Sequence, residues 1–312
     1  MVLLGCGALN VDYLYAAESL VTDGETFCNP VGRQPGGSAA NTVFVLARLG
    51  MPCRFAGVVG DDPDGGLVLE SLVAAGVDTD AVVVRRGQGT GRVFCFVDKK
   101  GHRALYVCPD ANLTVTAAEL ERAFTLQVSW VHCSSFAGDA PFAAQRSFVA
   151  GLPPGIRLSL APGALYAARG LAELHPFLRR CAVVFLTAAE LKTLTGIQEP
   201  LAGAQRLLRE GVHTVAVTLG REGSLVVTAE SQHRQPALAV DAVDTTGAGD
   251  AFAAGFLFCR LRGWAVDDAQ RFATVVASFA VENWGARSGA PDLAQARARY
   301  EKAFDAPFPE SL

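Results

Sequence analysis

Residues 244–258, DTTGAGDAFAAGFLF, join a glycine turn to an apolar helical pattern around a single carboxylate, Asp250. Upstream, the mostly apolar residues 236–243 predict a short strand, and downstream small and aromatic residues recur at helical spacing. We therefore expect the glycines to lie at a strand-to-helix turn.

The start of this predicted helix has the features of an anion-binding site. The backbone amides of Gly247, Ala248 and Gly249 would be unpaired there, and the positive end of the helix dipole adds to their effect. Such amides suit a phosphate or another oxyanion. Asp250 is favoured by the same dipole, so the local sequence leaves two roles open for it: stabilising the helix end or acting on a bound ligand.

Composition narrows the choice of partner. The chain has 312 residues, enough for one large α/β domain or two smaller ones, and half of them are hydrophobic. The formal net charge is −4. An acidic balance gives no support for a nucleic-acid or anionic-membrane partner, because both favour a basic surface. We expect the ligand to be a small molecule.

Cysteine usage and the N-terminal residues favour a cytoplasmic protein. Eight cysteines are scattered without a CxxC pair and mostly inside apolar runs, which is typical of reduced core thiols. No basic segment opens the sequence, Asn10 and Asp12 interrupt its first apolar run, and no apolar run reaches membrane-spanning length. The five histidines are dispersed without metal-ligand spacing, so we interpret them as structural.

Two polar segments near the N-terminus are candidate ligand contacts. Residues 2–9 predict a buried strand, and Asn10 and Asp12 follow it at the edge where open α/β sheets bind ligands, although both residues are also common turn formers. The segment 36–41, GGSAAN, precedes a helical pattern. Its paired glycines, Gly36 and Gly37, permit close backbone approach to a ligand, and the amide of Asn41 suits a hydroxyl.

The rest of the chain alternates strands with helical segments, which favours a mostly parallel sheet covered on both faces. Strands are predicted at 52–60, 128–133, 156–161, 183–187, 214–219 and 224–228, and a helix at 67–75. Glu190 follows one of these strands, either as a ligand contact or as a solvated acid in the first turn of a helix. Residues 218–223 form a glycine-bounded turn, suited to lying beside a planar ring or simply to joining two strands.

One region departs from this alternation. Residues 92–97 and 103–107 predict a hairpin around a turn at 98–101, with apolar side chains on both of its faces. A hairpin of this kind must be covered twice. One face could contact bound substrate while the other packs against a second copy of the protein. Alternatively, the hairpin packs onto the parent domain. As a hypothesis, the hairpin is a lid and a dimer contact.

Taken in order, these segments resemble the ribokinase-like (PfkB) carbohydrate and nucleoside kinases. Residues 244–256 are similar to the C-terminal signature of that family, and GGSAAN at 36–41 is similar to its N-terminal glycine signature. Asn10 to Asp12 resembles the early substrate-binding acid. Residues 108–112, CPDAN, resemble the PGAN segment, and Thr218 to Gly223 resembles the turn on the nucleotide side.

The resemblance implies a three-layer α/β/α core with a mostly parallel central sheet and a small β lid. It implies one domain over residues 1–312, with the lid inserted from approximately 11–34 and 86–110. It also implies ATP-dependent phosphorylation of an alcohol. Asp250 would be the base that accepts the hydroxyl proton, and the amides of residues 247–249 would hold the transferring phosphoryl group.

Further roles follow from the same resemblance. On the substrate side it implies Asp12, Asn10, Gly36, Gly37 and Asn41. On the nucleotide side it implies Thr187, Thr218, Gly220 and Gly223, with Glu190 acting on Mg²⁺ through water. A monovalent cation, K⁺, would bind near Asp244, Thr246 and Gly285. The homodimer through the lid is expected from the two apolar faces of the hairpin and not from the resemblance.

Two residues depart from the family pattern. Thr187 stands where the family motif that contains Glu190 usually has Asn, and its hydroxyl cannot copy an amide. Ala161 precedes Pro162 where these kinases often have Asp. The first departure puts the role of Thr187 in doubt, and the second removes a polar group from beside the site.

Other functional classes are less well supported. A dinucleotide-dependent oxidoreductase needs a GxGxxG turn, and both glycine turns here lack the third glycine; a Walker-type NTPase needs GxxxxGK followed by Ser or Thr, which the sequence does not contain. A non-catalytic sugar or nucleotide sensor with the kinase fold stays open. We favour a free sugar or nucleoside as acceptor. Arg92, Lys99, Lys100 and Arg103 either recognise a sugar phosphate or form a solvated lid surface.

Overall fold

The central sheet has eight strands in the order β14-β13-β12-β11-β10-β9-β1-β4 in the computed structural model, which describes residues 1–100 and 102–309. From β4 to β12 neighbouring strands run parallel, and β13 and β14 are added antiparallel at one edge. The mostly parallel sheet is therefore confirmed. Its strands are β1 Val2–Cys6, β4 Cys53–Ala56, β9 Val128–Ser134, β10 Arg157–Ala161, β11 Cys181–Thr187, β12 Thr214–Thr218, β13 Ser224–Thr228 and β14 Gln232–Gln235.

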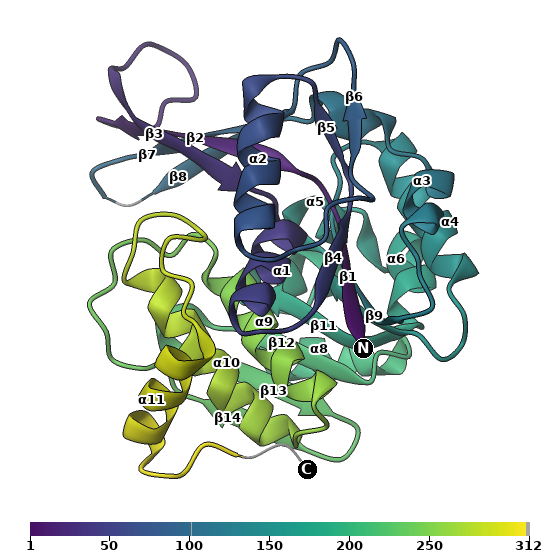
Figure 1. Cartoon of the computed structure of the whole chain (residues 1–312). Helices are drawn as coiled ribbons and strands as arrows, with labels where there is room; N and C mark the ends of the chain where they lie inside the picture. Colours follow the sequence, from purple (N-terminus) through teal and green to yellow (C-terminus); the bar gives the residue numbers. More distant parts are fainter. Residues whose placement is uncertain (101, 310–312) are drawn as a thin grey trace.

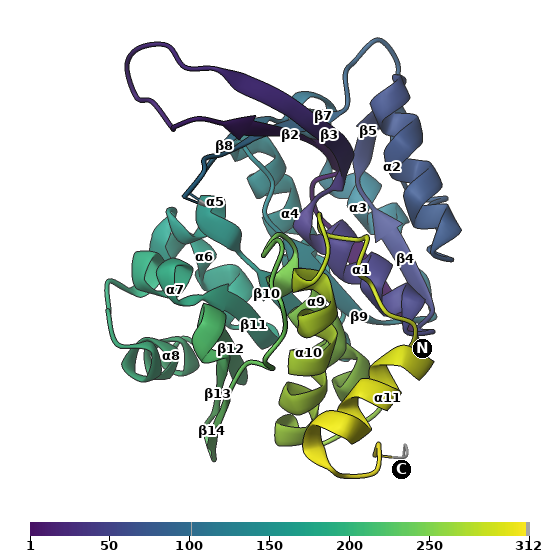
Figure 2. The ribbon, with the colours of Figure 1, turned by 90° about the vertical axis from the view of Figure 1, so that its left-hand side faces the viewer.

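Helices cover both faces of this sheet, as Figure 2 shows with α6, α7 and α8 on one side and α9, α10 and α11 on the other. Consecutive residues of a strand point to opposite faces, so Leu3 packs into one buried cluster and Leu4 into the other. The first cluster includes α1 Ser38–Arg48, α2 Pro63–Ala74, α9 Ala248–Leu261, α10 Val266–Val281 and α11 Leu293–Phe304. The second includes α3 Ala117–Arg122, α4 Asp139–Gly151, α5 Gly163–Ala167, α6 Gly170–Leu178, α7 Ala188–Thr195 and α8 Pro200–Arg209.

A second sheet, ordered β3-β2-β7-β8, projects from one end of the molecule (Figure 1). Its strands are β2 Asn10–Ala17, β3 Cys28–Gly36, β7 Gly91–Val97 and β8 Arg103–Cys108. The predicted hairpin is confirmed as β7 and β8, with the Gly101 position of its turn outside the described residues. Six of the eight cysteines are buried, and the two exceptions, Cys28 and Cys108, lie in this sheet.

The small elements complete the chain. β5 Val58–Gly60 and β6 Val83–Arg85 pair in a two-stranded sheet, and two 3₁₀ turns are formed by η1 Asp110–Thr114 and η2 Gly220–Glu222. Residues 52–60 are thus two strands, β4 and β5, rather than the one expected. The helix expected at 67–75 begins earlier, because Asp62 caps it by accepting from the Gly65 amide and Pro63 is the first helical residue.

Two predicted strands are wrong in their extent. β1 ends at Cys6, and Asn10 begins β2 of the second sheet, because the side chain of Asn112 bonds both the amide and the carbonyl of Leu9 between them. The segment 236–243 is irregular. It leaves the sheet after β14, and the amides of Val243 and Asp244 bond the Val281 carbonyl instead of a neighbouring strand. Among the described residues, no helix is both long and apolar enough to span a membrane.

Candidate active site

Several of the predicted site residues lie where the parallel strands end. Thr187 ends β11 and Thr218 ends β12, and the two are register partners on neighbouring strands. Glu190 follows in the first turn of α7, and it is close enough to Asp250 for its charge to raise the pKa of that residue. The carboxyl edge of a parallel sheet is where α/β folds bind their ligands.

The glycine turn before α9 has a conformation that glycine alone adopts readily. Gly247 has φ of 76°, and a Cβ added there would lie 2.6 Å from Cα of Ala286. The amides of Gly247 and Gly249 have no acceptor among the described residues. Ala248 differs from the expectation of three free amides, because its N–H donates to the Thr245 carbonyl at 3.3 Å. A Cβ on Gly249 would meet nothing within 4 Å, so this side of the turn is open.

Asp250 is held by the first turn of α1, which lies beside α9 (Figure 2). Its Oδ1 accepts from Ser38 Oγ at 2.7 Å, and its Oδ2 accepts from Asn41 Nδ2 at 2.9 Å. Burial raises the pKa of Asp250 to about 6, although the bonds from Asn41 and Ser38 act in the opposite direction. The carboxylate is thus held in position by two hydrogen bonds, and its pKa is raised above that of an ordinary aspartate.

Asp12 reaches the same region from β2. Its carboxylate packs directly on Gly36 of β3, where an added Cβ would lie 2.5 Å from both carboxylate oxygens. Burial raises the pKa of Asp12 to about 6, with Arg287 lowering it and Asp250 raising it further. Gly37 begins α1 with φ of 99°, and a Cβ there would lie 2.2 Å from the carbonyl oxygen of Ala8. Only glycine fits this approach.

Asn10 and Asn41 are already bonded within the protein. Oδ1 of Asn10 accepts from Asn112 Nδ2 at 3.0 Å, and Asn10 is 8% exposed. Asn41 is 5% exposed, donates to Asp250 and accepts from Arg287 Nε at 2.9 Å. A ligand hydroxyl could therefore use only the remaining N–H groups and the second lone pair of each amide oxygen. Asn112, in the segment that resembles PGAN, joins the second sheet to the core.

Sequence reasoning missed two residues of this cluster, Ser38 and Arg287. Ser38 lay inside GGSAAN without a role of its own. Arg287 is 8% exposed and lies in the turn after α10, where a single arginine shows no periodicity. The available signal was charge: two acids expected at one site, Asp12 and Asp250, favour a cation nearby.

The nucleotide-side residues are ordered by caps and turns. Thr187 and Glu190 form a capping box, in which Thr187 Oγ1 accepts from the Glu190 amide and Glu190 Oε2 accepts from the Thr187 amide. Glu190 therefore lies in the first turn of the helix, as expected, and caps it through Oε2. Its other carboxylate oxygen, Oε1, makes no hydrogen bond to a described residue. Gly220 and Gly223 bound η2 between β12 and β13, with φ of 61° and 92°.

The residues predicted for a monovalent cation also come together. Oδ1 of Asp244 accepts from the amide and the hydroxyl of Thr246, at 2.9 and 2.7 Å. Its Oδ2 accepts from the Gly285 amide at 2.9 Å. Asp244 therefore fastens the segment before the glycine turn to the loop that carries Arg287. β10 ends at Ala161, which leaves an apolar methyl at the second departure from the family pattern.

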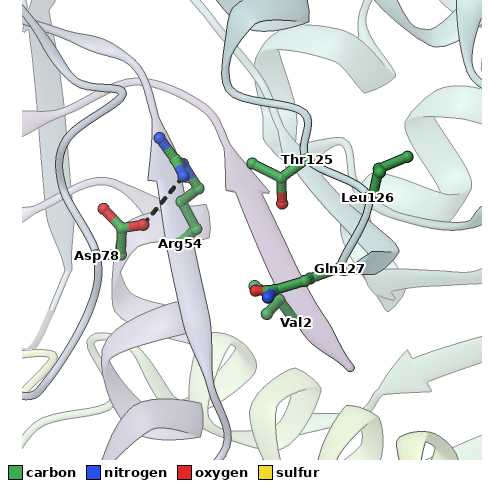
Figure 3. Close-up of a pocket in the computed structure, with 6 residues that line it drawn as sticks. All are labelled: Val2, Arg54, Asp78, Thr125, Leu126 and Gln127. Carbon is green, nitrogen blue, oxygen red and sulfur yellow. Dashed lines mark ion pairs between the residues drawn. The ribbon is translucent and has the colours of Figure 1, made fainter.

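A hollow of about 380 Å³ lies at the opposite edge of the sheet (Figure 3). It is lined by residues at the amino ends of β1, β4 and β9, and its one ion pair joins Arg54 to Asp78 at 3.1 Å. None of the predicted site residues faces it. The convergent polar groups, rather than this hollow, therefore mark the site.

Comparison with known proteins agrees with this geometry. The pfkB family carbohydrate kinase domain matches residues 5–293. The ATP-dependent ribose-1-phosphate kinase of Halopiger xanaduensis is 32% identical over 304 residues, 97% of this chain and 99% of that protein.

Two solved structures share the fold. Arabidopsis thaliana ribokinase complexed with ribose and ATP has a TM-score of 0.82 at 24% identity, covering 96% of this chain and 98% of its own. The nucleoside kinase of Burkholderia thailandensis with inosine has a TM-score of 0.84 at 21% identity, covering 98% of each chain. The chain therefore belongs to the pfkB family of carbohydrate kinases, with the ribokinase-like α/β fold, and is a phosphotransferase that acts on a hydroxyl group.

Proposed function

We propose that this protein transfers the γ-phosphoryl group of ATP to a hydroxyl of a small sugar or nucleoside, with Asp250 as the base. The observation that carries the proposal is the position of Asp250. Its carboxylate follows the open amides of Gly247 and Gly249 and is held from the other side by Ser38 and Asn41. Base and anion site thus belong to one helix start.

The residues present fit ATP and Mg²⁺. The open face of Gly249 and the two free amides suit phosphoryl oxygens, and the free oxygen of Glu190 suits a metal-bound water. Among the described residues, no three His, Cys, Asp or Glu side chains cluster as a metal site, so phosphate oxygens and water would complete the coordination. When bound, ATP and Mg²⁺ supply the phosphoryl group and neutralise part of its charge.

The protein's own contribution is positioning and proton transfer. Asp12 accepts a hydrogen bond from a hydroxyl of the acceptor and orients it. Asp250 accepts the proton of the reacting hydroxyl, and the Gly247 and Gly249 amides donate to the transferred group as its charge spreads. The second sheet acts as a lid that excludes water from this face.

The two faces of the lid differ in character. Asp12 is paired in register with Val93, and Val93 is paired with Val107. Cys95 and Leu105 are paired on the same face, which is therefore the face that carries Asp12. The other face is aromatic: Tyr15 stacks on Phe96 at 5.0 Å, and Tyr106 meets Phe96 edge-on at 6.0 Å. Leu105 and Tyr106 are 55% and 57% exposed. We propose that the aromatic face packs against a second copy of the chain.

Sugar phosphates are a second acceptor class to be tested, because a relative at 32% identity is a ribose-1-phosphate kinase. The lid cations offer it modest support. Arg92 pairs with Asp110 at 2.9 Å and Lys99 with Glu18 at 3.2 Å, which fits a solvated surface. Arg103 makes no ion pair with a described residue and is available to a phosphate.

The test is one panel of free sugars, nucleosides and sugar phosphates, assayed for acceptor-dependent ADP release with Mg²⁺ and ATP. We expect one class to give turnover, and Asp250→Ala to lower it by about 10²–10⁴ while ATP binding persists. If no acceptor of these classes stimulates ADP release, the proposed acceptor is wrong. If Asp250→Ala keeps full turnover, Asp250 is not the base.

A further inference from the structure

Arg287 is a buried cation without an ionic partner. It is 8% exposed, and no carboxylate of the described residues lies within ion-pair distance of it. Its guanidinium instead donates to neutral oxygens: Nε to Asn41 Oδ1 at 2.9 Å, Nη1 to Ser71 Oγ at 2.9 Å, and Nη2 to the Gly36 carbonyl at 3.1 Å. Burying an unpaired charge is costly, so a gain elsewhere must offset it.

The bond to Asn41 decides how that amide is oriented. A guanidinium has donors only, so the oxygen of Asn41 must face Arg287. The nitrogen of Asn41 then faces Asp250, where it donates to Oδ2 at 2.9 Å. If the amide were flipped by 180°, its NH₂ group would face the N–H donors of Arg287. Its oxygen would then face the carboxylate oxygens of Asp250. Arg287 therefore selects the orientation of Asn41 that supports the carboxylate.

The charge of Arg287 acts on the same groups. Burial lowers the pKa of Arg287 to about 10, so the side chain stays charged at neutral pH. That charge lowers the pKa of Asp12 and Asp250, which burial raises, whereas Glu190 on α7 raises the pKa of Asp250. These are the charged groups that face Asp250, and Arg287 is the cation among them.

We infer that Arg287 is a positioning residue for phosphoryl transfer, which locks the Asn41 amide against the base Asp250 and ties the Gly36 turn to the same point. The inference rests on the proposed function. It deepens that function by assigning a role to a loop residue that would act through Asn41.

Two substitutions separate charge from geometry. Arg287→Ala removes both, so kcat should fall up to about 100-fold and the acid limb of kcat/KM should move to higher pH. Arg287→Lys keeps the charge but loses the planar fork. Its kcat should fall while the acid limb stays in place. A loss of acceptor affinity alone, with kcat unchanged in both variants, overturns the assignment.

Arg299→Ala is the matched control. Arg299 is also a partly buried arginine near the C-terminal end, bonded to Ser278 and Glu282 and stacked 3.4 Å from the Phe279 ring, without contact to α1. It should lower the melting temperature as Arg287→Ala does but leave the pH profile unmoved. An equal shift of the acid limb in Arg299→Ala means that the effect of Arg287 is merely structural, and overturns the inference.

A measurement without turnover keeps this test apart from that of the proposed function. Melting temperatures of Asn41→Ala, Arg287→Ala and the double variant form a cycle. We expect the double variant to lose less than the sum of the single losses, because the two side chains act as one unit. Additive losses overturn the inference even if the wild type phosphorylates an acceptor. A silent wild type in the acceptor panel overturns the proposed function alone.

Discussion

Ser38 donates a 2.7 Å hydrogen bond to Asp250 across 212 positions of sequence, so the starts of α1 and α9 meet at one carboxylate. Asn41 binds the other oxygen of the same carboxylate. Both helices thus present their amino ends to a single negative charge, which their dipoles favour. The predictions below test how that charge and its surroundings are used.

Activity should fall on the acid side of neutrality. Asp250 and Asp12 both have a pKa raised to about 6, and each is needed as a carboxylate. kcat/KM should therefore decline below about pH 6, with a slope steeper than tenfold per unit because two coupled groups protonate. In Asp12→Asn the slope should return to about tenfold per unit. A flat initial-rate profile between pH 5 and 8 would contradict the assignment of the base.

The two glycines of the anion turn should respond differently to alanine. Gly249→Ala adds a methyl that touches no protein atom within 4 Å but occupies the ligand side. It should leave the melting temperature unchanged or slightly raised, by up to about 1 kcal/mol of stability, and lower kcat. Gly247→Ala forces a methyl against Ala286 at positive φ and should lower both. Full activity in Gly249→Ala would show that the phosphoryl group lies elsewhere.

Glu190→Gln should separate metal chemistry from helix capping. Glutamine can retain the capping-box bond to the Thr187 amide, so the melting temperature should change little. Loss of the charge should raise the Mg²⁺ concentration needed for half-maximal rate, and should lower the pKa of Asp250, which Glu190 raises. The checks are a Mg²⁺ titration of initial rates and the acid limb of kcat/KM. An unchanged Mg²⁺ requirement would argue against Glu190 on the metal side.

Substitutions on the two faces of the lid should have different effects. Tyr106→Glu places a charge on the aromatic face and should convert a dimer to a monomer in light scattering at micromolar concentration. Leu105→Asp alters the face shared with Asp12, so it should raise KM for the acceptor and leave the mass unchanged. A monomeric wild type disproves the proposed dimer, whatever the variants do.

Potassium should activate the enzyme. Asp244 links Thr246 and Gly285 directly beside the anion turn, so a cation bound there would add positive potential to the transferring group. Initial rates should be several-fold higher in potassium chloride than in the chloride of a bulky organic cation at equal ionic strength. Equal rates in the two salts would remove the proposed cation site.

The sequence predicted the parts of the fold that depend on local pattern. Continuous apolar runs indicate the buried strands of the parallel sheet. The paired glycines indicate the turn, where Gly247 has a positive φ. The strand expected at 236–243 was wrong because apolar composition does not supply a neighbouring strand. Ala248 was expected to have a free amide, yet the tight turn brings the Thr245 carbonyl within its reach.

Much of the site lay beyond local pattern. Asp12, Asn41 and Asp250 were expected to serve one reaction, and the structure adds the hydrogen bond that joins Asn41 to Asp250. Arg287 could not be singled out, because its three partners come from distant segments and only folding brings them together. The same holds for Asn10, whose bond to Asn112 spans 102 positions. Long-range polar contacts leave no periodic trace in a sequence.

The convergence of α1, α9 and the Arg287 loop also bears on biosynthesis. The helix that holds the Asp250 carboxylate, α1, is made early, whereas Asp250 and Arg287 are made late. During synthesis at about 5–20 residues per second, all eight strands of the central sheet are therefore made before Asp250. A truncated chain that ends before α9 lacks the proposed base, and we expect it to be inactive. On the proposed mechanism, activity thus depends on the contact between the late helix α9 and the early helix α1.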